Sequence, residues 1–237
     1  MNAAALVFLL DVDNTLLDND RFAADLGDTL EQAFGAVERE RYWSIYGELR
    51  DSLGYADYLG ALQRFRFGLD SEPALLQMSR YLLEYPFAER LYPHALETIA
   101  HLRSLAPTAI LSDGDVVFQP RKIEHAGIWT AARGEVLIYL HKQRMLAAMQ
   151  QRFPAAHYVM VDDKPQILAD MKRHMGRRLS TVFVRQGHYA VASAGEAIDP
   201  APDFTIACIG ELRQRKLEDF LPAARAIPLA APSSPSP

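Results

Sequence analysis

The feature that most constrains the fold is a short apolar run that ends in two acidic residues. Residues 6–10 read LVFLL, and Asp11 and Asp13 follow at once. A continuous apolar run of this length without helical spacing is typical of a strand buried on both faces of a parallel sheet. Two carboxylates at the end of such a strand either cap a turn or hold something positive. Which of these roles applies has to be inferred from residues elsewhere in the chain.

The remainder of the chain predicts a helical insertion within an α/β core. From about residue 18 to residue 92, the apolar and aromatic residues follow helical spacing, and β-branched residues are few. From residue 93 onward, helix-like and strand-like segments alternate, which predicts a parallel sheet with helices on its faces. We therefore expect the core to comprise residues 1–17 and 93–221, with a separate helical domain from residues 18–92.

Details of the second part can also be predicted. Apolar residues recur at every fourth position in two segments, namely Met145, Met149 and Phe153 in residues 142–153, and Ile167, Met171 and Met175 in residues 164–175. Such stripes predict two helices that pack on the sheet. Residues 203–212 predict an edge strand and the start of a last helix. Residues 222–237 are rich in Pro, Ala and Ser, so we expect a disordered tail.

A second acidic pair and a serine follow other predicted strands. The segment HYVMV runs directly into Asp162 and Asp163, while Ser112 and Asp113 follow the segment TAIL. In sheets of this kind, ligands bind beyond the carboxyl ends of the strands. If the three strands are parallel neighbours, their polar residues meet at one edge, and Lys142, after the segment EVLIYL, can point to the same edge. The acidic pair before Pro165 is also compatible with helix capping.

The chemistry that suits these residues is phosphoryl transfer. Clustered carboxylates repel one another unless a cation lies among them, and ligands that are all oxygen suit Mg²⁺. An aspartate beside that ion can attack phosphorus and form an acyl phosphate, while a neighbouring carboxyl protonates the leaving oxygen and later activates water. A serine hydroxyl and a lysine ammonium would bind the phosphoryl oxygens.

These motifs resemble those of the haloacid dehalogenase (HAD) superfamily of hydrolases, in its phosphatase branch with a helical cap of the C1 type. DVDNTL resembles motif I, with Asp11 at the nucleophile position and Asp13 at the acid/base position. Ser112 in LSDGD resembles motif II, Lys142 resembles motif III, and VDDK resembles motif IV. The resemblance implies a Rossmann-like core and a cap inserted just after motif I, where the predicted helical domain lies.

The resemblance also implies roles for the site residues. The Mg²⁺ ligands would be Asp11, the backbone carbonyl of Asp13, and Asp163, with Asp162 just outside them. The phosphate-binding residues would be Ser112, Asp113 and Lys142. Motif III often reads Lys-Pro, but Lys142 is followed by Gln143, so Lys122 and Lys164 are alternative phosphate-binding lysines.

The leading functional hypothesis is a Mg²⁺-dependent phosphatase that hydrolyses a small phosphomonoester through an aspartyl phosphate. Dehalogenation is an alternative, although the family's dehalogenases lack the second aspartate of motif I and bind no metal. Phosphomutase or phosphonatase chemistry is closer, but a phosphonatase usually has a lysine in its cap, and residues 18–92 contain none. A catalytically idle binding protein would show damaged motifs, and none is visible.

Composition limits the partners and the location. The chain has 25 basic and 30 acidic residues, which give a net charge of −5. No basic field is available for a nucleic-acid backbone, so nucleic acid is not an expected partner. The single cysteine, the absence of a basic leader and the lack of a long apolar stretch predict a cytoplasmic protein without a membrane span. The sequence leaves the oligomeric state open.

Overall fold

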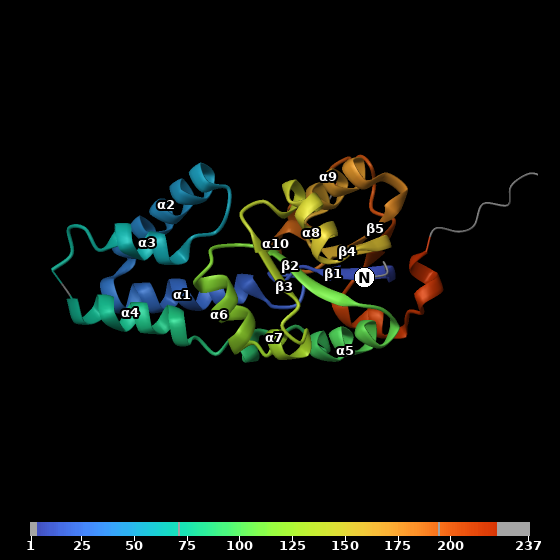
Figure 1. Ribbon diagram of the computed structural model, residues 1–237. Coiled ribbons are helices and arrows are strands. Elements are labelled where there is room, and N and C mark those ends of the chain that lie inside the picture. Colours follow the sequence, from blue (N-terminus) through green and yellow to red (C-terminus); the bar gives the residue numbers. More distant parts are fainter. Residues whose placement is uncertain (1–3, 71, 194, 222–237) are drawn as a thin grey trace, which may run out of the picture.

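The computed structural model describes residues 4–70, 72–193 and 195–221. Within these residues, six parallel strands form one sheet with the order β3-β2-β1-β4-β5-β6 (Figure 1). The strands are β1 (Ala4–Leu10), β2 (Thr108–Asp113), β3 (Val136–Tyr139), β4 (Ala155–Asp162), β5 (Leu179–Val184) and β6 (Phe204–Ile206). The predicted α/β fold with a Rossmann-like parallel sheet is confirmed.

Strand β1 lies in the middle of the sheet and is buried on both faces, as its apolar run predicts. Leu6, Phe8 and Leu10 join a hydrophobic cluster on one face, whereas Val7 and Leu9 join a separate cluster on the other. This division follows from the alternation of side chains along a strand. Each of the five is at most 1% exposed, and burial of each contributes roughly 1.5–3 kcal/mol.

Helices cover both faces of the sheet. Those on the first face are α5 (Ala95–Leu105), α6 (Phe118–His125) and α7 (Ile128–Ala131), and those on the second are α8 (Leu146–Arg152) and α9 (Pro165–Met175). A short helix, α10 (Gly187–Ala192), follows β5. In Figure 1, α5 and α7 lie below the sheet, while α8 and α9 lie above it.

Four further helices form a lobe beside the sheet, which we call the helical lobe (Figure 1). They are α1 (Asn19–Phe34), α2 (Ala36–Leu53), α3 (Tyr58–Phe65) and α4 (Glu72–Glu84). Asp18 and Asp57 begin α1 and α3, because their side-chain oxygens accept hydrogen bonds from the backbone N–H groups of Arg21 and Gly60. All four helices lie between residues 18 and 92.

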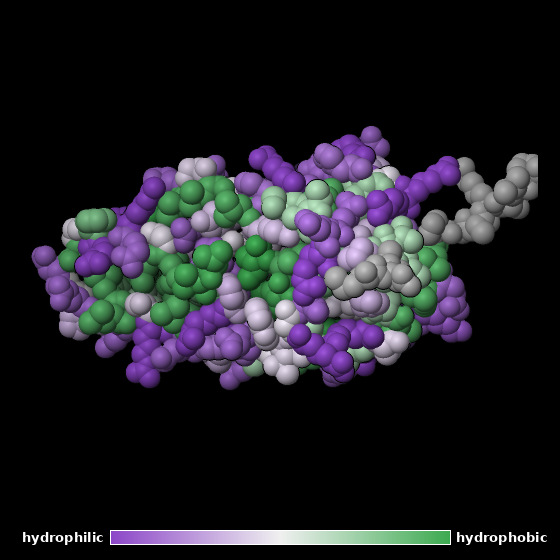
Figure 2. Space-filling model, in the orientation of Figure 1, coloured by the Kyte–Doolittle hydropathy of each residue, from purple (hydrophilic) through white to green (hydrophobic). Residues whose placement is uncertain are grey.

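The hydrophobic cluster on the first face of the sheet continues into the helical lobe. It contains Leu10 and Val12 near the end of β1 together with Phe22, Leu26 and Phe65 from the lobe. Figure 2 shows hydrophobic residues over the lobe and toward the middle of the molecule. This shared core holds the lobe against the part of the sheet in which β1 ends.

The structure differs from the expected helices in two segments. The helix expected over residues 142–153 begins only at Leu146, because residues 142–144 form a 3₁₀ turn and Met145 is 39% exposed. The prediction of a last α-helix after the edge strand is wrong, because residues 209–214 and 217–220 form 3₁₀ helices instead. The tail expected at residues 222–237 lies outside the described residues. Among the described helices, none is both long and apolar enough to cross a membrane.

Candidate active site

Three neighbouring strands deliver the predicted site residues to one edge of the sheet. Strand β1 pairs with β2 on one side and with β4 on the other. Asp11 follows β1, Ser112 lies near the end of β2, and Asp162 and Asp163 lie at the end of β4. All four are buried. The condition that these strands be parallel neighbours is therefore met.

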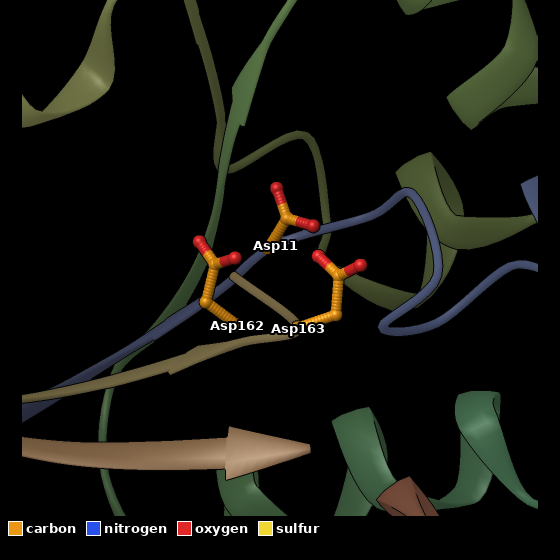
Figure 3. Close-up of side chains that lie close together, drawn as sticks. All are labelled: Asp11, Asp162 and Asp163. Carbon is orange, nitrogen blue, oxygen red and sulfur yellow. The ribbon is translucent and has the colours of Figure 1, made fainter. Parts of the chain in front are cut away.

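Asp11, Asp162 and Asp163 form a buried acidic group, which we call the aspartate trio (Figure 3). One carboxylate oxygen from each residue lies within 4.8 Å of those of the other two. In Figure 3 the three carboxyl groups project to the same side of the strand ends. Asp11 is 6% exposed, and Asp162 and Asp163 are 0% exposed. Water therefore does little to screen the repulsion between the three carboxylates.

Lys142 is the cation that bonds to the trio. Its Nζ lies 2.5 Å from Oδ1 of Asp11 and 2.6 Å from Oδ2 of Asp162. Its backbone N–H donates to Oδ1 of Asp113 at 2.6 Å, which fixes the turn after β3. Although burial disfavours the charged form, the carboxylates of Asp11 and Asp162 raise the pKa of Lys142, so it remains an ammonium.

The other contacts of the trio differ from residue to residue. Asp11 also accepts a hydrogen bond from the hydroxyl of Thr15 at 3.2 Å. Oδ1 of Asp162 accepts one from the backbone N–H of Lys164 at 2.8 Å, whereas its Oδ2 has the ion pair with Lys142 but no hydrogen bond among the described residues. In the described part of the chain, neither oxygen of Asp163 has a hydrogen-bond partner, although both are buried.

Buried carboxylates that outnumber their cations are costly, and their pKa values reflect this cost. Burial raises the pKa of Asp11 to about 7, and Asp162 adds to the rise against the opposing effect of Lys142. Burial and the charges of Asp162 and Asp11 also raise the pKa of Asp163 well above its usual range. A hard divalent cation among these oxygens would supply the missing charge. The donor set, all oxygen and partly without partners, fits such an ion.

Asp13 lies outside the trio and has its own cation. Its Oδ1 accepts a hydrogen bond from Nζ of Lys122 at 2.8 Å, and its Oδ2 accepts one from Nε2 of Gln119 at 3.3 Å. Gln119 also donates to the hydroxyl of Ser112 at 3.0 Å, so it connects the residues of motifs I and II. We did not predict Gln119 from the sequence, and we predicted Lys122 only as an alternative phosphate ligand.

The third lysine of interest, Lys164, bonds to the trio through its backbone N–H but not through its ammonium. Its Nζ lies over the ring of Tyr189 in α10, 4.9 Å from the ring centroid. Across residues 4–70, 72–193 and 195–221, this ammonium forms no ion pair. Among the described residues, Lys142 is thus the lysine whose ammonium pairs with the trio, while the ammonium of Lys122 pairs with Asp13.

The helical lobe contacts the core on two sides of this site. On one side, Asp20 of α1 accepts hydrogen bonds from Asn14 and from the backbone N–H of His188. On the other, Gly54 at the end of α2 lies so close to His141 that an added Cβ would clash with the imidazole ring. His141 immediately precedes Lys142, so the lobe closes against the loop that carries this lysine.

Comparison with known proteins adds independent information. The family model of haloacid dehalogenase-like hydrolases matches residues 6–169. A solved haloacid dehalogenase-like hydrolase of Burkholderia xenovorans LB400 is 53% identical, with a TM-score of 0.84, over 90% of this chain and 99% of the other. A search of curated proteins found no match.

More distant structures share the fold. L-2-haloacid dehalogenase from Xanthobacter autotrophicus is 20% identical, with a TM-score of 0.58, over 87% of this chain and 96% of the other. A HAD-hydrolase from Bacillus subtilis, bound to magnesium, is 16% identical, with a TM-score of 0.60, over 88% of this chain and 97% of the other. At these identities the likeness concerns architecture and leaves the reaction open.

Proposed function

We propose that this chain, which belongs to the haloacid dehalogenase-like hydrolases, is a Mg²⁺-dependent phosphatase that hydrolyses a small phosphomonoester. The observation that carries the proposal is Asp163, whose two buried oxygens have no partner among the described residues and lie beside Asp11. A buried carboxylate without a partner is expensive unless a cation binds it. A second aspartate, Asp13, is available next to this centre for proton transfer.

The residues that would hold Mg²⁺ are Asp11, Asp163 and the backbone carbonyl of Asp13, with Asp162 oriented by Lys142 and Lys164. When bound, the ion would neutralise the negative charge of the phosphoryl group and keep Asp11 ionised. Oδ1 of Asp162 accepts a hydrogen bond from the backbone of Lys164, and Oδ2 is ion-paired with Lys142, which suits an outer role. The full Asp163 carboxylate remains available.

Two chemical steps follow from this arrangement. In the first, a carboxylate oxygen of Asp11 attacks phosphorus, the bond to the leaving oxygen breaks, and Asp13 gives that oxygen a proton. In the second, Asp13 takes a proton from water, the water oxygen attacks the phosphorus of the aspartyl phosphate, and free phosphate leaves as the Asp11 carboxylate is restored. Ser112, Asp113 and Lys142 would position the phosphoryl oxygens.

Dehalogenation is the second candidate, because the chain shares its fold with L-2-haloacid dehalogenases. Asp13 and Asp163, whose oxygens have no partner in the part of the chain that the structure describes, favour phosphate ester hydrolysis instead. Direct assays separate the two. We expect phosphate release from an aryl phosphate in the presence of Mg²⁺ and no chloride release from L-2-chloropropanoate. Chloride release without phosphate release would overturn the proposal.

Lys142 provides the first test of an individual role. Replacing Lys142 by Ala removes a preorganised charge from the phosphoryl site, so we expect kcat for an aryl phosphate to fall by on the order of a hundredfold or more. Inhibition by inorganic phosphate should weaken as well. Lys164→Ala is the competing variant, because the charges of Asp11 and Asp163 raise the pKa of its partly buried ammonium although it forms no ion pair with the trio among the described residues. If Lys164→Ala is the damaging change and Lys142→Ala is mild, Lys164 is the phosphate ligand.

The charge of the chain and its architecture also bear on partners. With a net charge of −5, the protein has no electrostatic preference for nucleic acid. We propose that the substrate is a small phosphorylated molecule. We also propose a cytoplasmic location, as expected from the sequence. A screen of phosphorylated metabolites, each with and without Mg²⁺, would identify the substrate.

A further inference from the structure

Lys122 is a buried lysine that has no role in the two chemical steps proposed above. It belongs to α6, which follows the motif II loop, and it is 1% exposed. Its Nζ donates to Oδ1 of Asp13 at 2.8 Å and to Oδ1 of Asn19 at 2.9 Å. Within the described residues, Asp13 is the carboxylate that forms an ion pair with it.

Aromatic rings surround this ammonium. The centroids of Phe22, Tyr58 and Phe87 each lie 5.8 Å from Nζ, and that of Phe118 lies 5.4 Å away. These distances are within the range of cation–π attraction. Rings exclude water, however, so the carboxylate of Asp13 and the amide oxygen of Asn19 supply hydrogen bonds that water would otherwise make with this ammonium.

The surroundings come from two parts of the molecule. Asn19, Phe22 and Tyr58 belong to the helical lobe, whereas Phe118 and Lys122 belong to the core. Lys122 therefore connects Asp13 to the lobe through one buried charge. The lobe must be in place for the ammonium to have its full set of partners.

We propose that Lys122 is a positioning residue for Asp13: its ammonium, which also bonds to Asn19 of the helical lobe, holds the acid/base carboxylate in its working orientation. This inference rests on the proposed function for the role of Asp13. With Oδ1 engaged by Lys122 at 2.8 Å, Oδ2 is the oxygen that exchanges a proton with the leaving group or with water. Its contact to Gln119 is longer, at 3.3 Å, and is more easily given up.

A kinetic double-mutant cycle tests this role. Lys122→Met keeps an apolar chain of similar length among the rings, and we compare it with Asp13→Asn and with the double variant. For an alkyl phosphate, whose leaving oxygen needs a proton, Lys122→Met should lower kcat by roughly tenfold to a hundredfold. For an activated aryl phosphate the first step should change much less. In the Asp13→Asn background, Lys122→Met should cost less than about threefold.

Equal losses on both substrates, or losses that add fully in the double variant, would show that Lys122 acts by another route. Lys216→Met, at an exposed position, is the matched control and should leave both activities unchanged. Lys122→Arg retains the charge and should recover part of the alkyl phosphatase activity if the ion pair, rather than the shape, is what matters.

Thermal unfolding provides a readout that does not depend on the reaction. Asp13→Asn leaves the buried ammonium without a countercharge, so we expect Tm to fall by about 5 °C or more. Adding Lys122→Met should then restore part of the loss, which makes the double variant more stable than Asp13→Asn alone. A double variant less stable than both single variants would refute the link. If the wild type releases no phosphate, the proposed function fails, while this thermal cycle still decides whether Lys122 and Asp13 are coupled.

Discussion

Replacing Asp11 by Asn should abolish phosphate ester hydrolysis, with a loss of about 10⁴-fold or more. An amide neither attacks phosphorus nor balances a bound cation as a carboxylate does, so no phosphoenzyme should form. The side chain lies at the end of the central strand, where Lys142 and Thr15 orient its two oxygens. The amide fits the same space, so the loss should reflect chemistry rather than misfolding.

Asp13→Asn should behave differently, and the contrast separates the two aspartates. It slows leaving-group protonation and water activation, each worth roughly 10²–10⁴-fold. With an activated aryl phosphate, the first step needs little protonation, so phosphate should accumulate on the protein. The measurement is intact-protein mass after quenching in acid, followed by peptide mapping. Phosphate on Asp11 in the Asp13→Asn variant supports the assignment, whereas phosphate on the Asp11→Asn variant would overturn it.

Removal of the metal should have the second large effect. In excess chelator, hydrolysis of an aryl phosphate should fall by about a hundredfold or more and should return with Mg²⁺, because among the described residues the aspartate trio is left with Lys142 as its one ion-paired cation. Full activity in excess chelator would contradict the proposed metal centre. The same conclusion would follow if Mg²⁺ failed to restore the activity.

Asp163→Asn tests the metal without an assay of activity. At a hundredfold excess over its Kd, a bound ion stabilises by about 2.7 kcal/mol, so Mg²⁺ should raise the Tm of the wild type by about 5 °C or more. The variant should lose this rise. In chelator, the variant should be at least as stable as the wild type, because its amide can donate to a neighbouring carboxylate instead of repelling it. Asp28→Asn, at an exposed position of α1, is the matched control.

Short segments of the sequence were sufficient to predict most of the strands of the core and the edge at which they end. The run before Asp11 has no polar residue on either face, so it predicts a central strand, and it occupies that place between β2 and β4. Asp162 and Ser112 could be assigned to the same edge, because parallel strands end together. This inference needs only strand ends and a parallel sheet, and both can be read from short segments.

Tertiary contacts overrode the helical pattern at Lys142. The apolar spacing of Met145, Met149 and Phe153 predicted one helix over residues 142–153, but the helix starts at Leu146. The side chain of Lys142 is held by Asp11 and Asp162, and its backbone N–H by Asp113. These bonds impose a 3₁₀ turn before the helix, at the expense of Met145, which is left partly exposed.

The family of the chain, the parallel sheet and the aspartates at its carboxyl edge can all be predicted from the amino-acid sequence, because they follow from segments of a few residues and their order. Which lysine pairs with which aspartate depends instead on contacts between distant segments. Lys122, Lys142 and Lys164 have chemically identical side chains. Asp13, which pairs with Lys122, lies 109 residues away in the sequence, and Asp11, which pairs with Lys142, lies 131 residues away. Folding distributes them, since a buried ammonium must lie where a carboxylate compensates the loss of its hydration.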